Sequence, residues 1–114
     1  MKYKLKVIVL ENCPYSIAAA ELLENYNIQF QKKLVKQNNK EKFKTNEIST
    51  FPQIYMINKT EQILLGGYSD LEEIMNIINS SKNLDKIKDE LKKKYLNNKN
   101  NLKIILRIIQ IFIS

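Results

Sequence analysis

A chain of 114 residues, of which 44% are hydrophobic, is long enough for one folded domain with a short appendage. The single cysteine excludes an intramolecular disulfide, and the lack of histidine excludes His-based catalysis and the usual zinc sites in one chain. The net charge is +7, but residues 1–80 hold ten lysines against nine acids, so the basic excess lies in residues 81–114. This pattern argues against nucleic acid as a partner of the main domain.

The first two predicted elements meet at a lone cysteine. Residues 5–10 are β-branched and apolar, which predicts a buried strand, and the apolar spacing from Pro14 onward predicts a helix. Cys13 therefore lies at a helix N-terminus, where unpaired N–H groups and the helix dipole favour the nucleophilic thiolate. The alternative from position alone is a buried cysteine that acts as a small apolar side chain.

Further along, the pattern predicts a strand at residues 28–35, then a loop and a short, lightly packed helix that ends near Ile48. Residues 53–65 predict a β-hairpin, with Pro52 just before its first strand. The two glycines, Gly66 and Gly67, indicate a tight turn or a close approach to a ligand.

The last helix of the main domain is predicted from the spacing of Leu71, Ile74, Met75 and Ile78, with Ser69 or Asp70 as its cap. The order of elements is then β-α-β-α-β-β-α over about 80 residues. Because crossovers are right-handed, this order predicts an α/β fold with a mixed four-stranded sheet and helices on both faces.

Three separated motifs resemble the glutaredoxin family, which has the thioredoxin fold. They are Cys13-Pro14-Tyr15-Ser16 after the first strand, Thr50-Phe51-Pro52 before the third, and Gly66-Gly67-Tyr68-Ser69-Asp70 before the last helix. The resemblance implies a redox-active thiol-disulfide oxidoreductase that uses glutathione as co-substrate. It implies glutathionylated proteins or small disulfides as the partners.

The resemblance also implies roles for individual residues. Cys13 would be the nucleophile, and Pro52 the cis-proline that lies against it. The remaining candidates would bind glutathione: Phe51 would offer its backbone to the cysteinyl part, Tyr15 would flank the groove, and Gly67, Ser69 and Asp70 would hold the γ-glutamyl end. In that arrangement Asp70 receives the ammonium group. Each residue also has a purely structural alternative. Pro52 could be a trans proline at a sheet edge, Gly66-Gly67 only a turn, Ser69-Asp70 only a helix cap, and Tyr15 only a packing residue.

Two positions depart from the family pattern. Ser16 replaces the second cysteine of the common Cys-x-x-Cys motif, so the resemblance implies a monothiol cycle through Cys13. Leu10 stands where members commonly carry Lys or Arg, and Lys44, Lys32 and Lys33 are the candidate replacements. Two other functions stay open: a dimer that binds a [2Fe–2S] cluster through Cys13 and glutathione, with Cys13 as the only metal ligand of the chain, and a non-catalytic adaptor.

Residues 81–114 are interpreted as a basic, helical extension of a domain at residues 1–80. A helix is predicted at residues 85–96, followed by a polar linker and an apolar segment at residues 102–113. That segment could fold back, contact a protein partner or second copy, lie on a membrane surface, or form a strand. We expect a cytoplasmic monomer without a signal peptide or membrane span, and removal of residues 98–114 should improve solubility without abolishing thiol activity.

Overall fold

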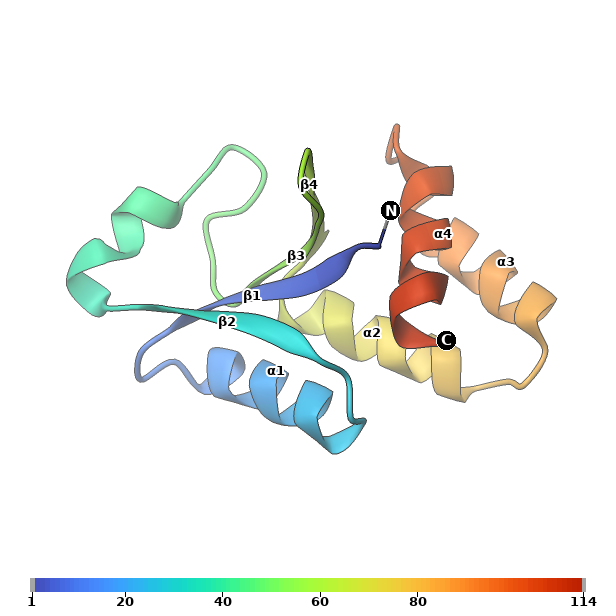
Figure 1. The fold of residues 1–114 in the computed structure, drawn as a ribbon, viewed down its shortest axis with the longest axis horizontal. Coiled ribbons are helices and arrows are strands. Elements are labelled where there is room, and N and C mark those ends of the chain that lie inside the picture. Colours follow the sequence, from blue (N-terminus) through green and yellow to red (C-terminus); the bar gives the residue numbers. More distant parts are fainter. Residues whose placement is uncertain (1, 114) are drawn as a thin grey trace.

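A computed structural model describes residues 2–113 (Figure 1). The chain forms four strands, four α-helices and a short 3-10 helix, η1, within these residues. In chain order they are β1 (Lys4–Leu10), α1 (Pro14–Asn25), β2 (Phe30–Val35), η1 (Gln37–Phe43), β3 (Gln53–Ile57), β4 (Gln62–Gly66), α2 (Tyr68–Asn79), α3 (Leu84–Lys94) and α4 (Asn101–Phe112).

The strands form one mixed sheet in the order β2-β1-β3-β4. β1 and β2 are parallel, with Leu5 opposite Phe30. Helix α1 carries the chain back along the sheet, so that both strands start at the same end of it. β3 runs antiparallel to both β1 and β4, and the β3–β4 hairpin turns at Asn58, whose side chain accepts the backbone N–H groups of Thr60 and Glu61. The predicted mixed four-stranded sheet is therefore confirmed.

The two faces of the sheet are covered unequally. Alternate residues of β1, Leu5, Val7 and Val9, pack with α1 and α2 in the main hydrophobic core. On the other face Ile8, Val35 and Tyr55 form a small cluster, against which Phe43 of η1 packs. Helices thus lie on both faces, as predicted, but within residues 2–113 the cover of the second face is the short helix η1 and the neighbouring loop.

The helix expected to end near Ile48 is wrong in type and position. The segment forms η1, which ends at Phe43, and Thr45 then closes a turn by accepting the backbone N–H groups of Glu47 and Ile48. The physical reason is composition, because η1 has no buried residue and Phe43 is its one apolar residue. A full amphipathic helix needs several apolar residues on one face.

The C-terminal segment folds back on the rest of the chain. Ile104, Ile105 and Ile108 of α4 belong to the same buried cluster as β1 and α2, and α4 lies beside α3 near the start of β1 (Figure 1). Lys103 forms an ion pair with Glu61 in the β3–β4 turn, and the Arg107 guanidinium lies 4.7 Å from the ring centre of Tyr3. The segment is helical rather than a strand.

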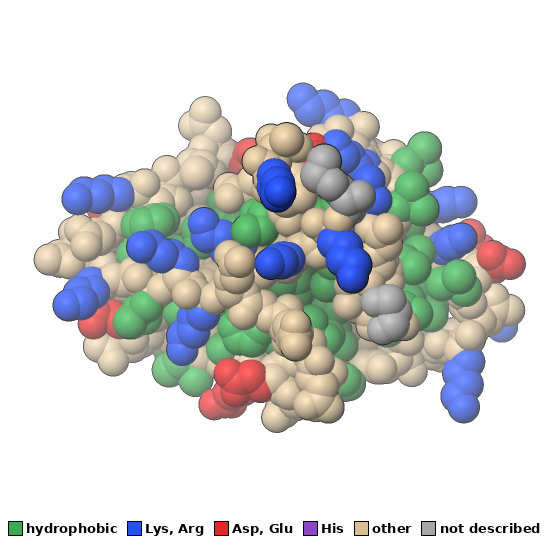
Figure 2. All heavy atoms as spheres, viewed as in Figure 1, with side chains coloured by type: hydrophobic (Ala, Val, Ile, Leu, Met, Phe, Trp, Pro, Cys, Tyr) green, Lys and Arg blue, Asp and Glu red, His purple; other side chains and the backbone are tan. Residues whose placement is uncertain are grey.

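The surface is basic in several places. Figure 2 shows several Lys and Arg side chains around the N-terminal end of β1, beside α4, and others along β2. Lys2 and Lys4 are exposed there, so part of the positive surface comes from the main domain as well as from the tail. Across residues 2–113, no helix is both long enough and apolar enough to cross a bilayer.

Candidate active site

Cys13 lies between the end of β1 and the start of α1. It is the N-cap residue of α1, with Pro14 as the first helical residue, and its carbonyl oxygen accepts the N–H of Ile17. Asn12 turns the chain with a positive φ of 57°, and the Cys13 N–H donates to the carbonyl of Leu10. Cys13 thus lies at the helix N-terminus, as the sequence predicts, and it is partly exposed rather than buried.

The Phe51–Pro52 peptide bond lies opposite this thiol. It is cis, which is the geometry that the resemblance implies for Pro52. The Cys13 sulfur lies 3.9 Å from the Phe51 carbonyl oxygen, although the two residues are 38 positions apart. Pro52 itself is buried. The fold therefore brings the first two motifs into direct contact.

A groove of about 450 Å³ continues from this contact toward α2. It is lined by Tyr15, Glu47, Ile48, Thr50, Phe51, Leu64, Gly66, Gly67, Tyr68, Ser69 and Asp70. Five of the predicted glutathione-binding residues thus line one groove. The sixth, Pro52, borders the groove: its carbonyl oxygen would lie 3.6 Å from a Cβ added to Gly67. Sequence reasoning missed Glu47, Ile48 and Leu64, which carry no motif signal, whereas Thr50 and Tyr68 lie inside the motifs.

Asp70 occupies the far end of the groove and holds the start of α2. The N-cap is Gly67, not Ser69 or Asp70 as predicted; Asp70 lies in the first turn, and its Oδ2 accepts the Gly67 N–H at 2.9 Å. Gly66 has a positive φ of 135°, a conformation that favours glycine. Ser69 is exposed in the first turn, beside the free N–H groups of the helix.

A residue of the C-terminal extension also reaches Asp70. The Nζ of Lys94, in α3, lies 2.8 Å from Asp70 Oδ1 and 2.8 Å from Glu73 Oε2. Burial lowers the pKa of Lys94, but hydrogen bonds and charge attraction from the two carboxylates outweigh burial, so the pKa is raised overall. Lys94 is therefore a charged group held against Asp70 from outside the groove lining, and sequence reasoning missed it.

Comparison with known proteins agrees with this geometry. A family model described as glutaredoxin matches residues 3–61, just over half of the chain. The chain belongs to the glutaredoxin family. Among solved structures, it is similar to glutaredoxin 1 from Francisella tularensis in complex with cacodylate, with 25% identity and a TM-score of 0.55, over 69% of this chain and 99% of that chain. No curated protein sequence matches. The thioredoxin-like fold is thus established, and members of the family are in general thiol oxidoreductases that use glutathione.

The aromatic wall of this glutaredoxin groove is formed by two tyrosines. The rings of Tyr15 and Tyr68 are 5.9 Å apart and tilted by 44°. The Tyr68 hydroxyl donates to Glu72, and this hydrogen bond to a carboxylate raises the pKa of Tyr68. Tyr15 lines the groove and is 63% exposed, so its ring contact with Tyr68 lies at the surface rather than in the core.

Leu10 does not face the groove. It packs against the cluster of Ile8, Val35 and Tyr55, on the sheet face that η1 covers. None of the three candidate replacement lysines lines the groove: Lys44 pairs with Glu41 at 2.9 Å, and Lys32 borders a separate hollow between α1 and β2. The ionisable groups of the described groove lining are tyrosines and the carboxylates Glu47 and Asp70.

Ser16 has a structural role in this glutaredoxin. Its side chain is 1% exposed, and its Oγ accepts the Leu10 N–H at 3.0 Å, which ties β1 to α1 behind Cys13. We expect Ser16→Ala to lower the free energy of unfolding by about 1–3 kcal/mol, because the Leu10 N–H loses its acceptor. Urea unfolding measures this change. Ser80→Ala, which removes an exposed hydroxyl at the end of α2, is the control and should change stability far less. Equal losses would contradict the role of Ser16.

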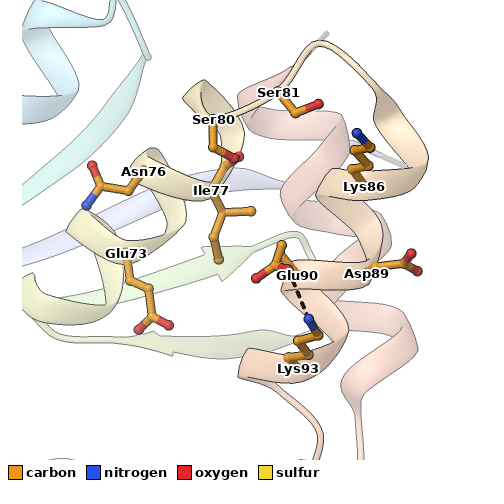
Figure 3. Close-up of a pocket in the computed structure, with 9 residues that line it drawn as sticks. All are labelled: Glu73, Asn76, Ile77, Ser80, Ser81, Lys86, Asp89, Glu90 and Lys93. Carbon is orange, nitrogen blue, oxygen red and sulfur yellow. Dashed lines mark hydrogen bonds and ion pairs between the residues drawn. The ribbon is translucent and has the colours of Figure 1, made fainter.

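A larger hollow of about 820 Å³ lies away from the thiol, between α2 and α3 (Figure 3). It is open and lined mostly by polar and charged side chains, including Glu73, Asp89 and Lys86. The figure shows these side chains spread around the hollow, with one ion pair, between Glu90 and Lys93. Since it holds neither the thiol nor the groove residues, the smaller groove is the candidate active site.

Proposed function

We propose that this glutaredoxin is a monothiol reductase of glutathione mixed disulfides, with Cys13 as its nucleophile. The observation that carries the proposal is the position of the sole cysteine, at the N-terminus of α1 and against the carbonyl of Phe51. The helix N-terminus stabilises a thiolate by its free N–H groups and dipole. Ser16 is buried and hydrogen-bonded, and a serine cannot form the disulfide of a dithiol cycle.

The proposed cycle has two thiol–disulfide exchanges. The Cys13 thiolate attacks the glutathione sulfur of R–S–S–G, forms Cys13–S–S–G, and releases RS⁻, which takes up a proton. The thiolate of a second glutathione then attacks the glutathione sulfur bound to Cys13, which forms oxidised glutathione and restores the Cys13 thiolate. In sum, one mixed disulfide is reduced to a thiol, and two glutathione units leave as their disulfide.

The groove supports glutathione as the bound group. The backbone of Phe51 would pair with the cysteinyl part beside Cys13, with Pro52 and Tyr15 at the sides. The γ-glutamyl carboxylate would lie at the first turn of α2, at the free N–H of Ser69 and beside Gly67, whose own N–H is bound by Asp70; a helix start is a common anion site. Asp70 would receive the ammonium group.

The proposal also covers the organisation of the chain. We infer that residues 1–80 carry the family's domain and that residues 81–114 are an extension packed on it. The protein would act as a monomer in a reducing compartment such as the cytoplasm. The alternative is a [2Fe–2S] cluster, which with one cysteine per chain would need thiolates from glutathione and a second copy of the chain.

The test is turnover of the mixed disulfide of glutathione and 2-mercaptoethanol, with glutathione and its reductase present. We expect the wild type to turn over and Cys13→Ser to fall to the uncatalysed rate, because serine is a far weaker nucleophile at this position. Circular dichroism should show that both proteins are folded. A folded, colourless wild type without turnover would contradict the proposed reductase and favour the non-catalytic adaptor function.

A further inference from the structure

The C-terminal extension places a cation, Lys94, against Asp70, the carboxylate that would bind the substrate ammonium group in the proposed function. The Lys94 side chain is 9% exposed, and its ammonium group bridges Asp70 and Glu73 at 2.8 Å each. Asp70 is then engaged on both oxygens, by the Gly67 N–H on Oδ2 and by Lys94 on Oδ1. Lys94 belongs to α3, outside the family match at residues 3–61.

We propose that Lys94 competes with the ammonium group of the bound glutathionyl substrate for Asp70, and so lowers the selectivity of the site for that group. This inference rests on the proposed function, and it names a specificity-determining residue supplied by the extension. The substrate class that follows is a γ-glutamyl-type disulfide recognised mainly by its carboxylate and backbone, with a reduced contribution from its amine.

The physical argument is a competition between two like charges for one carboxylate oxygen. A substrate ammonium at Asp70 Oδ1 would lie beside the Lys94 ammonium, and like charges at hydrogen-bond distance repel. Lys94 cannot easily leave, because its stem is buried and Glu73 holds it from α2. The same cation lies near the first turn of α2, where it favours the substrate carboxylate.

Anchoring of α3 keeps Lys94 in place. Ile87 and Leu91 of this helix are in the main core, and the hydroxyl of the next residue, Tyr95, donates to the Leu65 carbonyl in β4. Burial is the largest cause of a strong rise in the pKa of Tyr95, so its hydroxyl stays protonated as a donor. The position of Lys94 at Asp70 is thus set by packing rather than by the ion pair alone.

The test compares two mixed disulfides of 2-mercaptoethanol, one with glutathione and one with glutaryl-Cys-Gly, which lacks only the α-amino group. The measured quantity is the second-order rate constant for transfer of glutathione or of its analogue to Cys13. Mass spectrometry follows the modified protein in single-turnover experiments. Lys94→Met removes the charge and keeps the apolar stem. Asp70 and Glu73 are exposed enough for water to solvate them, so the variant should stay folded.

We expect the ratio of the two rate constants, glutathione over the deaminated analogue, to rise roughly tenfold in Lys94→Met, which corresponds to about 1.4 kcal/mol. Lys93→Met is the matched control, since Lys93 is 75% exposed and pairs with Glu90 (Figure 3), away from Asp70, and its ratio should equal that of the wild type. Adding Asp70→Asn to Lys94→Met should return the ratio to a low value.

Each other outcome has a clear meaning. A purely structural role of Lys94 would change both rate constants equally, and an unchanged ratio would overturn the inference while the proposed function stands. A lower ratio would mean that Lys94 positions Asp70 for the ammonium, which also overturns it. No transfer to Cys13 from either disulfide in the wild type would overturn the proposed function together with the inference.

Discussion

Ile108→Ala should lower the free energy of unfolding by about 2–5 kcal/mol. Ile108 is 0% exposed in the middle of α4, inside the core that β1 and α2 share. Its truncation removes apolar contacts and leaves a cavity, and such a loss is large against a total stability of about 5–15 kcal/mol. Urea unfolding, followed by circular dichroism, measures the change as a shift of the midpoint.

The same helix offers the control. Leu106, two residues away, is 55% exposed, so Leu106→Ala should change stability by no more than about 0.5 kcal/mol. Similar effects of the two substitutions would mean that α4 is not packed as described. The burial of Ile104 and Ile108 also removes the basis for expecting a harmless deletion of residues 98–114, because the apolar face assumed to be exposed lies in the core.

Gly66→Ala should damage both stability and the groove. Gly66 has φ of 135°, where an alanine costs about 1–3 kcal/mol, and the added Cβ would clash with the Asp70 carboxylate. Asp70 would have to move, which breaks its hydrogen bond to the Gly67 N–H and costs a further ~0.5–2 kcal/mol as a lost helix cap. We expect unfolding at lower urea concentration and a slower transfer of glutathione to Cys13.

The neighbouring Gly67 is the control, because it has neither the positive φ nor the close contact of Gly66. Gly67 has φ of −100°, which any residue adopts, and a Cβ there would meet only the Pro52 carbonyl oxygen at an ordinary 3.6 Å. Gly67→Ala should therefore cost less than about 1 kcal/mol in unfolding free energy. If Gly67→Ala destabilised the protein as much as Gly66→Ala, the positive φ of Gly66 would not be the cause.

The order of elements follows from local patterns. Continuous apolar runs predict β1 and β3, apolar residues at helical spacing predict α1 and α2, and turn residues predict the turn at Asn58. Each of these patterns acts over a few neighbouring residues, so sequence reasoning found them. The 3-10 helix η1 was missed because its polar residues bury nothing and carry no period. The predicted start of α2 also lies too far along the chain, because glycine is a weaker cap signal than Ser69 or Asp70 and the observed N-cap is Gly67.

The candidate site divides in the same way. Cys13, Pro52 and Asp70 stand in short motifs that are readable in the sequence, and the resemblance of these motifs to one family predicts that they lie around one groove. Only the tertiary structure decided where α3 and α4 pack, and therefore that Lys94 meets Asp70 across 24 positions. The physical reason is that an apolar helix buries its face wherever the core is open, and no local pattern specifies that place.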